Sequence, residues 1–156
     1  MSDLALFLHL LGVLAFVSGV ALAGVAFESA RRRERPAEIA LLLGLARVGA
    51  VFVMAGGLLL LAGGLWIVGL EDDVDFGTGW ISAALTLFVL ALLLGGLGGQ
   101  QPKRARLLAS RLAEEGEGMH AELRALLDDP ISRLANYASA ALILAILALM
   151  VFKPGG

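Results

Sequence analysis

Few residues of this 156-residue chain can do chemistry, and the first of them is a histidine inside an apolar run. His9 stands between Leu8 and Leu10 and shares one helical face with Gly12 and Phe16, so it would point toward neighbouring helices. An imidazole in such a place can ligate haem or copper, relay protons or make a structural hydrogen bond. These alternatives stay open, and His9, Gly12 and Phe16 are candidate ligand-binding residues.

Asn136 and Tyr137 form a second candidate ligand-binding pair in another apolar run, where they would line a cavity or bond to a neighbouring helix. A metal site is harder to assemble, because the chain has no cysteine and only two histidines. The second histidine, His120, lies in a charged segment away from His9. We therefore expect no cofactor, with haem at His9 as the alternative, and the metal ligands are unknown.

Known catalytic motifs are missing from the sequence. It contains no G-x-S-x-G, HExxH or P-loop, and no apolar run carries a central Asp or Glu. Enzyme activity stays uncertain, and the sequence favours a non-enzymatic protein. The net charge of −2 provides no overall attraction for nucleic acid, so no nucleic-acid partner is expected.

Composition shows which elements must position these residues. The chain is 59% hydrophobic and 17% charged, with a mean hydropathy of +0.88, which excludes an ordinary soluble domain. Four apolar runs are long enough to cross a bilayer, which takes about 20 helical residues. They cover approximately residues 4–27, 39–70, 76–97 and 131–152. The sequence predicts an all-α fold in one integral membrane domain, residues 1–156: a transmembrane antiparallel four-helix bundle.

The segment 102–129 between the third and fourth runs has the pattern of an amphipathic helix. Gly116 and Gly118 are expected to break it into two helices. This predicted cytoplasmic segment would lie on the inner membrane surface or pack on an extended second span.

The distribution of positive charge predicts the orientation in the membrane. Eleven of the twelve basic residues fall between spans one and two, between spans three and four, or at the adjoining span ends. By the positive-inside rule that side is cytoplasmic, which predicts a multi-pass protein of the bacterial plasma membrane with both termini outside. The first span is expected to be a retained anchor, because its arginines follow the apolar run. Residues predicted to contact lipid headgroups are Arg31, Arg32, Arg33, Arg47, Lys103, Arg104 and Arg106.

Glycines at regular spacing predict how the first two spans pack. Gly49, Gly56 and Gly63 recur every seven residues in span two, as do Gly57 and Gly64. Span one has a related stripe of small residues: Gly12, Ala15, Gly19 and Ala23. Glycines at this spacing form a groove along a helix that lets another backbone approach closely. The simplest interpretation is tight packing between spans one and two, and the alternative is room for a flat ligand or lipid.

The sequence Leu8-His9-Leu10-Leu11-Gly12, followed by a small-residue stripe and an arginine-rich loop, resembles an uncharacterised bacterial family. That family consists of predicted four-span integral membrane proteins of unknown function, and the resemblance covers nearly the whole chain. The first helix is also similar to that of copper-resistance-D-type proteins and HemJ-type membrane protoporphyrinogen oxidases. This second resemblance implies a ligand role for His9 alone.

Three functional hypotheses follow from these patterns. The leading one is a non-enzymatic bundle that binds a lipid or another hydrophobic ligand, or assembles with partners. A haem- or metal-linked redox protein that uses His9 is the second, and a small oligomeric channel or transporter is the third. Membrane lipids are the expected partners, and a homo-oligomer is an open alternative.

Overall fold

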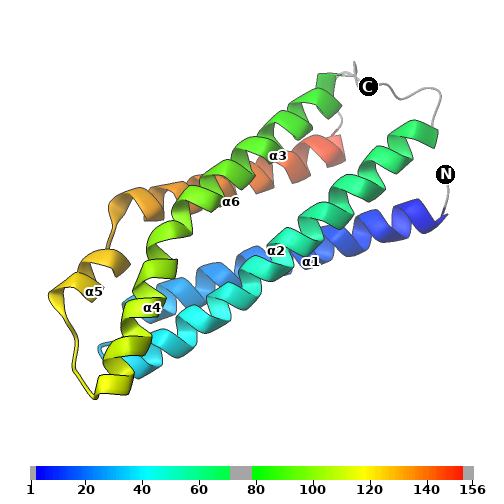
Figure 1. Ribbon diagram of the computed structural model, residues 1–156. Helices are drawn as coiled ribbons and strands as arrows, with labels where there is room; N and C mark the ends of the chain where they lie inside the picture. The colour runs from blue at the N-terminus through cyan, green and yellow to red at the C-terminus, as the bar shows by residue number, and fades with distance from the viewer. Residues whose placement is uncertain (1–2, 71–78, 153–156) are drawn as a thin grey trace.

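The computed structural model describes residues 3–70 and 79–152, and helices with short connections make up these ranges (Figure 1). The helices are α1 (Asp3–Arg31), α2 (Pro36–Leu70), α3 (Gly79–Gly98), α4 (Gln100–Glu115), α5 (Ala121–Leu127) and α6 (Pro130–Phe152). Four helical segments in this part of the chain are long and apolar enough to cross a membrane. The predicted all-α membrane fold is confirmed. Residues 76–78, the expected start of the third span, lie outside the described residues.

Local sequence signals explain where the helices around the predicted segment 102–129 begin and end. Gly116 ends α4 in the left-handed conformation with φ of 70°, which glycine adopts without steric cost. Asp129 caps α6, because its Oδ2 accepts a hydrogen bond from the backbone N–H of Ser132 at 2.7 Å. The segment is therefore divided into α4 and α5, and α4 packs on α2 through Ala105 and Ala109.

Helices α1 and α2 form an antiparallel pair in which the two backbones touch. A Cβ atom on Gly19 would lie only 2.7 Å from the carbonyl oxygen of Gly49, and one on Gly63 would lie 2.7 Å from the backbone nitrogen of His9. Gly56 likewise lies against the backbone of Phe16. The close packing of the first two spans predicted from the glycine spacing is thus confirmed.

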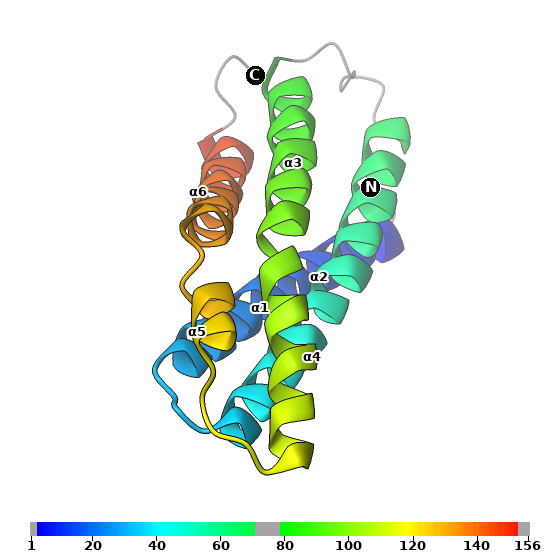
Figure 2. The ribbon, with the colours of Figure 1, turned by 60° about the vertical axis from the view of Figure 1, so that its left-hand side comes forward.

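Helices α3 and α6 form the second antiparallel pair, and side-chain hydrogen bonds join it. The hydroxyl of Ser139 donates to the carbonyl oxygen of Ala91 at 2.8 Å, and the Asn136 amide donates to the carbonyl oxygen of Gly98 at 3.5 Å. Figure 2 shows α4 continuing the course of α3 beyond the start of α6. The longer α1–α2 pair accompanies α4 over that extension.

Two apolar clusters connect the pairs. The membrane cluster contains Phe16, Ala84, Phe88, Ala91, Ile143 and Ile146, with the rings of Phe16 and Phe88 5.5 Å apart between centroids. The second cluster contains Phe27, Ala30, Ile39, Leu43, Ala105, Ala109, Leu112, Leu123 and Leu127. The 20 residues of α3 span ~30 Å, the thickness of the hydrocarbon core. An α3 that crosses the bilayer with its whole length would place α4 and the second cluster beyond the hydrocarbon core. They lie at the end of the molecule that carries Arg31–Arg35, which we call the arginine-rich end.

The glycine contacts predict the effect of adding one methyl group to α2. The Gly56→Ala substitution should lower the free energy of unfolding by about 1–3 kcal/mol, because its Cβ would overlap the α1 backbone. Thermal unfolding of the detergent-solubilised protein, followed by fluorescence of Trp66 and Trp80, measures this change.

The matched control is Gly44→Ala in the same helix, where an added Cβ meets nothing within 4 Å. It should leave the midpoint unchanged or raise it, since alanine favours helix by up to about 1 kcal/mol over glycine. Equal midpoints for both variants would contradict the close backbone packing.

Candidate functional site

A cavity of about 570 Å³ lies between the α3–α4 junction and the first turns of α6. We call it the α3–α6 groove. Its lining residues are Leu94, Leu97, Gln100, Gln101, Asp129, Ile131, Ser132, Leu134, Ala135 and Ala138. This volume falls within the range of small-molecule sites, roughly 300–1,000 Å³.

The walls of the groove are apolar and its floor is made of small residues. Leu97, Ile131 and Leu134 are all exposed, so in a bilayer the groove opens sideways toward lipid. Ser132 and Ala135 are buried. Because these α6 side chains are small, α6 does not fill the groove itself.

Polar groups gather at the arginine-rich end of the groove. Gln100 and Gln101 come from the first turn of α4, and Asp129 faces them from the start of α6. The Oε1 atom of Gln101 is buried and has no hydrogen-bond partner among residues 3–70 and 79–152. Lys103 and Arg104, both exposed, follow the glutamines by one helical turn. The groove therefore passes from an apolar half to a polar end formed by Gln100, Gln101 and Asp129, and Lys103 and Arg104 lie next to this end without lining it.

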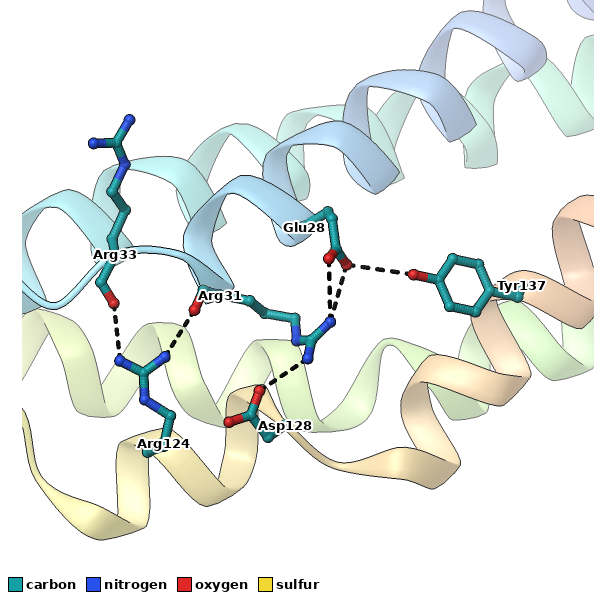
Figure 3. Close-up of polar contacts among 6 residues, drawn as sticks. All are labelled: Glu28, Arg31, Arg33, Arg124, Asp128 and Tyr137. Carbon is teal, nitrogen blue, oxygen red and sulfur yellow. Dashed lines mark hydrogen bonds and ion pairs between the residues drawn. The ribbon is translucent and has the colours of Figure 1, made fainter.

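A set of polar contacts, here called the clamp, holds the neighbouring chain segments in place (Figure 3). The Arg31 guanidinium is largely buried, with a side-chain exposure of 13%. It bonds to Glu28 Oε2 at 3.0 Å and to Asp128 Oδ1 at 2.9 Å, and the Tyr137 hydroxyl donates to Glu28 Oε2 at 3.4 Å. These contacts tie the end of α1 to the segment before α6 and to α6 itself.

Arg124 of α5 completes the clamp from the other side. Its guanidinium donates to the carbonyl oxygens of Arg31 at 2.7 Å and Arg33 at 3.2 Å (Figure 3). The last carbonyls of a helix lack partners within the helix, so a guanidinium there both bonds to them and offsets the helix dipole. Because Asp128 directly precedes Asp129, the clamp also fixes the start of α6, one wall of the groove.

The residues predicted from the sequence to bind a ligand fall into two separate places. His9 and Gly12 lie in the α1–α2 contact, where the His9 ring bonds through Nδ1 to the Leu60 carbonyl oxygen at 3.0 Å. Phe16 packs on Phe88 beside a cavity of only about 20 Å³.

Asn136 and Tyr137 lie on α6, and Tyr137 contacts Glu28, nineteen residues along α1 from His9. That distance along the helix is roughly 28 Å. The structure thus does not bring the two groups together, and the ligand role of each stays a prediction.

The predicted headgroup contacts are distributed along the arginine-rich end. Arg31 is engaged in the clamp and Arg33 approaches Glu38 at 3.6 Å. The remaining exposed members are Arg32, Arg47, Lys103 and Arg104, while Arg106 is half-buried. Their contact with headgroups stays a prediction. Within residues 3–70 and 79–152 no group of three or more His, Cys, Asp or Glu residues could hold a metal ion.

Sequence reasoning missed Glu28, Arg124 and Asp128 of the clamp and Gln101 of the groove. Arg31 and Asp128 are 97 positions apart, so their pairing leaves no local pattern in the sequence. One weak signal existed: Glu28 lies three residues before Arg31, the spacing of an ion pair on one helical turn.

The four long apolar helical segments within residues 3–70 and 79–152 define an integral membrane protein with several spans. The chain belongs to the family described as "Predicted integral membrane protein (DUF2269)", which matches residues 3–154. No curated protein and no solved structure gave a significant match. Because this match covers nearly the whole chain, the predicted resemblance to an uncharacterised membrane family is confirmed. The family description names no activity.

The clamp predicts that Arg124→Gln destabilises the arginine-rich end. Loss of the two bonds to the carbonyl oxygens of Arg31 and Arg33 should cost about 1–3 kcal/mol, typical of hydrogen bonds that involve a charged group. Limited proteolysis in the 116–120 connection should speed up, and the thermal midpoint should fall. Arg111→Gln, at an exposed position of α4, is the control and should change neither measurement.

The hydrogen bond between His9 and Leu60 predicts a second measurable effect, on stability. His9→Ala should lower stability by about 0.5–2 kcal/mol, since it removes the bond to Leu60 inside the membrane. Leu10→Ala, an exposed neighbour, is the control for loss of side-chain volume. Thermal midpoints and visible absorption spectra are recorded together, and a haem band that disappears in His9→Ala would instead establish the redox hypothesis.

Proposed function

We propose that this protein binds an amphipathic lipid in the α3–α6 groove and has no enzymatic role there. The observation that carries the proposal is a groove of about 570 Å³ with apolar walls that ends at Gln100, Gln101 and Asp129. Such a shape suits a ligand with an acyl chain at one end and a polar headgroup at the other.

The direction from which a ligand enters supports a lipid over a water-soluble compound. The groove walls Leu97, Ile131 and Leu134 are exposed, and exposed leucine and isoleucine side chains at the level of the spans face acyl chains. A lipid can therefore slide in laterally from the bilayer, without crossing a layer of water.

The position of the polar end supports the same ligand class. Helix α3 spans ~30 Å, so the first turn of α4 falls at the level of the lipid headgroups. Gln100, Lys103 and Arg104 then face the phosphate layer while the leucines face the acyl chains.

For the orientation we propose that the arginine-rich end faces the cytoplasm and that both termini lie outside the bacterial plasma membrane. Eleven of the twelve basic residues support this by the positive-inside rule. The groove then opens to the inner leaflet.

Filling the groove tests the proposal. Ala138→Trp places a large ring among the lining residues and should reduce co-purified lipid several-fold. Native mass spectrometry of the protein released from mild detergent counts bound lipid. Ala148→Trp, at an exposed position of the same helix, is the matched control and should keep wild-type lipid.

Thermal midpoints close to that of the wild type would show that both tryptophan variants are folded. If Ala138→Trp retains as much lipid as Ala148→Trp, the groove is not the binding site and the proposal is wrong.

A further inference from the structure

Arg133, in the first turns of α6, has a guanidinium that no group of the described chain engages. Its side chain forms no hydrogen bond and no ion pair with residues 3–70 and 79–152. The residue is half-buried, and its Nε atom is enclosed, whereas neither Nη atom is buried. The stem of the side chain is therefore packed within the protein while the end of the guanidinium stays accessible.

The carboxylates at the start of α6 are bound by other groups. Asp129, four positions before Arg133, uses Oδ2 to accept the backbone hydrogen bond that caps α6. Glu28 and Asp128 both bond to the Arg31 guanidinium in the clamp (Figure 3). Arg133 is thus a cation beside the clamp for which the described residues provide no anionic partner.

Contacts with α3 define the depth of Arg133. Gly98 is the last residue of α3, and a Cβ atom on it would lie 3.1 Å from the carbonyl oxygen of Ser132, the residue before Arg133. An α3 that crosses the bilayer with its whole length reaches the phosphate layer at this level. Tyr137 lies one turn further along α6 on the same face and is 57% exposed, as amphipathic aromatic rings are at membrane interfaces.

We infer that Arg133 binds the phosphate of a phospholipid in the leaflet at the arginine-rich end. A planar guanidinium donates two parallel hydrogen bonds to phosphate oxygens, which makes it well suited to this group. The acyl chains then follow Ala141 and Leu144, which are exposed two and three turns further along α6 on this face. This site is separate from the α3–α6 groove, because Arg133 does not line the groove.

Removal of the charge at Arg133 tests the inference. Phosphatidylglycerol is titrated into the protein in mild detergent, with binding measured by native mass spectrometry in the wild-type and the Ala138→Trp background. Arg133→Gln should weaken binding about tenfold in both backgrounds, or ~1.4 kcal/mol. Arg111→Gln removes the same charge at an exposed position of α4, and as the matched control it should keep the wild-type affinity.

Two further ligands show whether the site recognises phosphate and whether it needs a lipid. Diacylglycerol with the same acyl chains lacks the phosphate, so its binding should not change in Arg133→Gln. Inorganic phosphate should raise the thermal midpoint less than phosphatidylglycerol does at the same concentration. Arg133→Lys keeps the charge but cannot form the paired hydrogen bonds, so its affinity for phosphatidylglycerol should fall between those of wild type and Arg133→Gln.

The outcomes separate a lipid-phosphate site from other roles of Arg133. Equal affinities of Arg133→Gln and Arg111→Gln for phosphatidylglycerol overturn the inference, and so does equal stabilisation by inorganic phosphate, which would indicate a soluble anion. Arg133→Gln should keep the wild-type thermal midpoint, and a large decrease would overturn the inference by showing a structural role. Lipid that survives Ala138→Trp contradicts the groove function and leaves the Arg133 site unaffected.

Discussion

The contact on which the rest of the structure depends is the backbone-to-backbone packing of α1 against α2. Within a bilayer there is no hydrophobic effect between helices, so association relies on dispersion and on bonds between helices. Glycines remove the side chains that would hold the two backbones apart, as at Gly19 and Gly49. The resulting pair is a long platform. The membrane cluster attaches to it through Phe16, and α4 and α5 attach to its extension through Phe27 and Ile39.

The second pair follows another principle, and the groove is its consequence. Asn136 and Ser139 bond α6 to α3. Tyr137, which directly follows Asn136, bonds instead to Glu28 of α1. Helix α6 is thus attached on two sides over the same turns. Its first turns are held by the clamp through Asp128, and the small residues on their other face leave space beside α3.

Sequence reasoning predicted the parts of this structure that have a regular pattern. Apolar runs indicated the spans, and the seven-residue spacing of Gly49, Gly56 and Gly63 indicated the α1–α2 contact. The sequence could not predict the groove, and the reason is physical. Helix α3 is apolar on all sides, so its hydropathy does not show which face meets α6. The clamp joins residues 97 positions apart, and such a pair has no signature within any one segment.

Depth in the membrane decides which polar groups can serve a ligand. A polar group in hydrocarbon must bond within the protein, and His9 does so through the Leu60 carbonyl. Gln100 and Asp129 line the groove next to the end of α3, and a helix of ~30 Å that crosses the bilayer with its whole length reaches the level of water and headgroups there. The same groove has its apolar half within reach of acyl chains, which is why a ligand that fills both halves must be amphipathic.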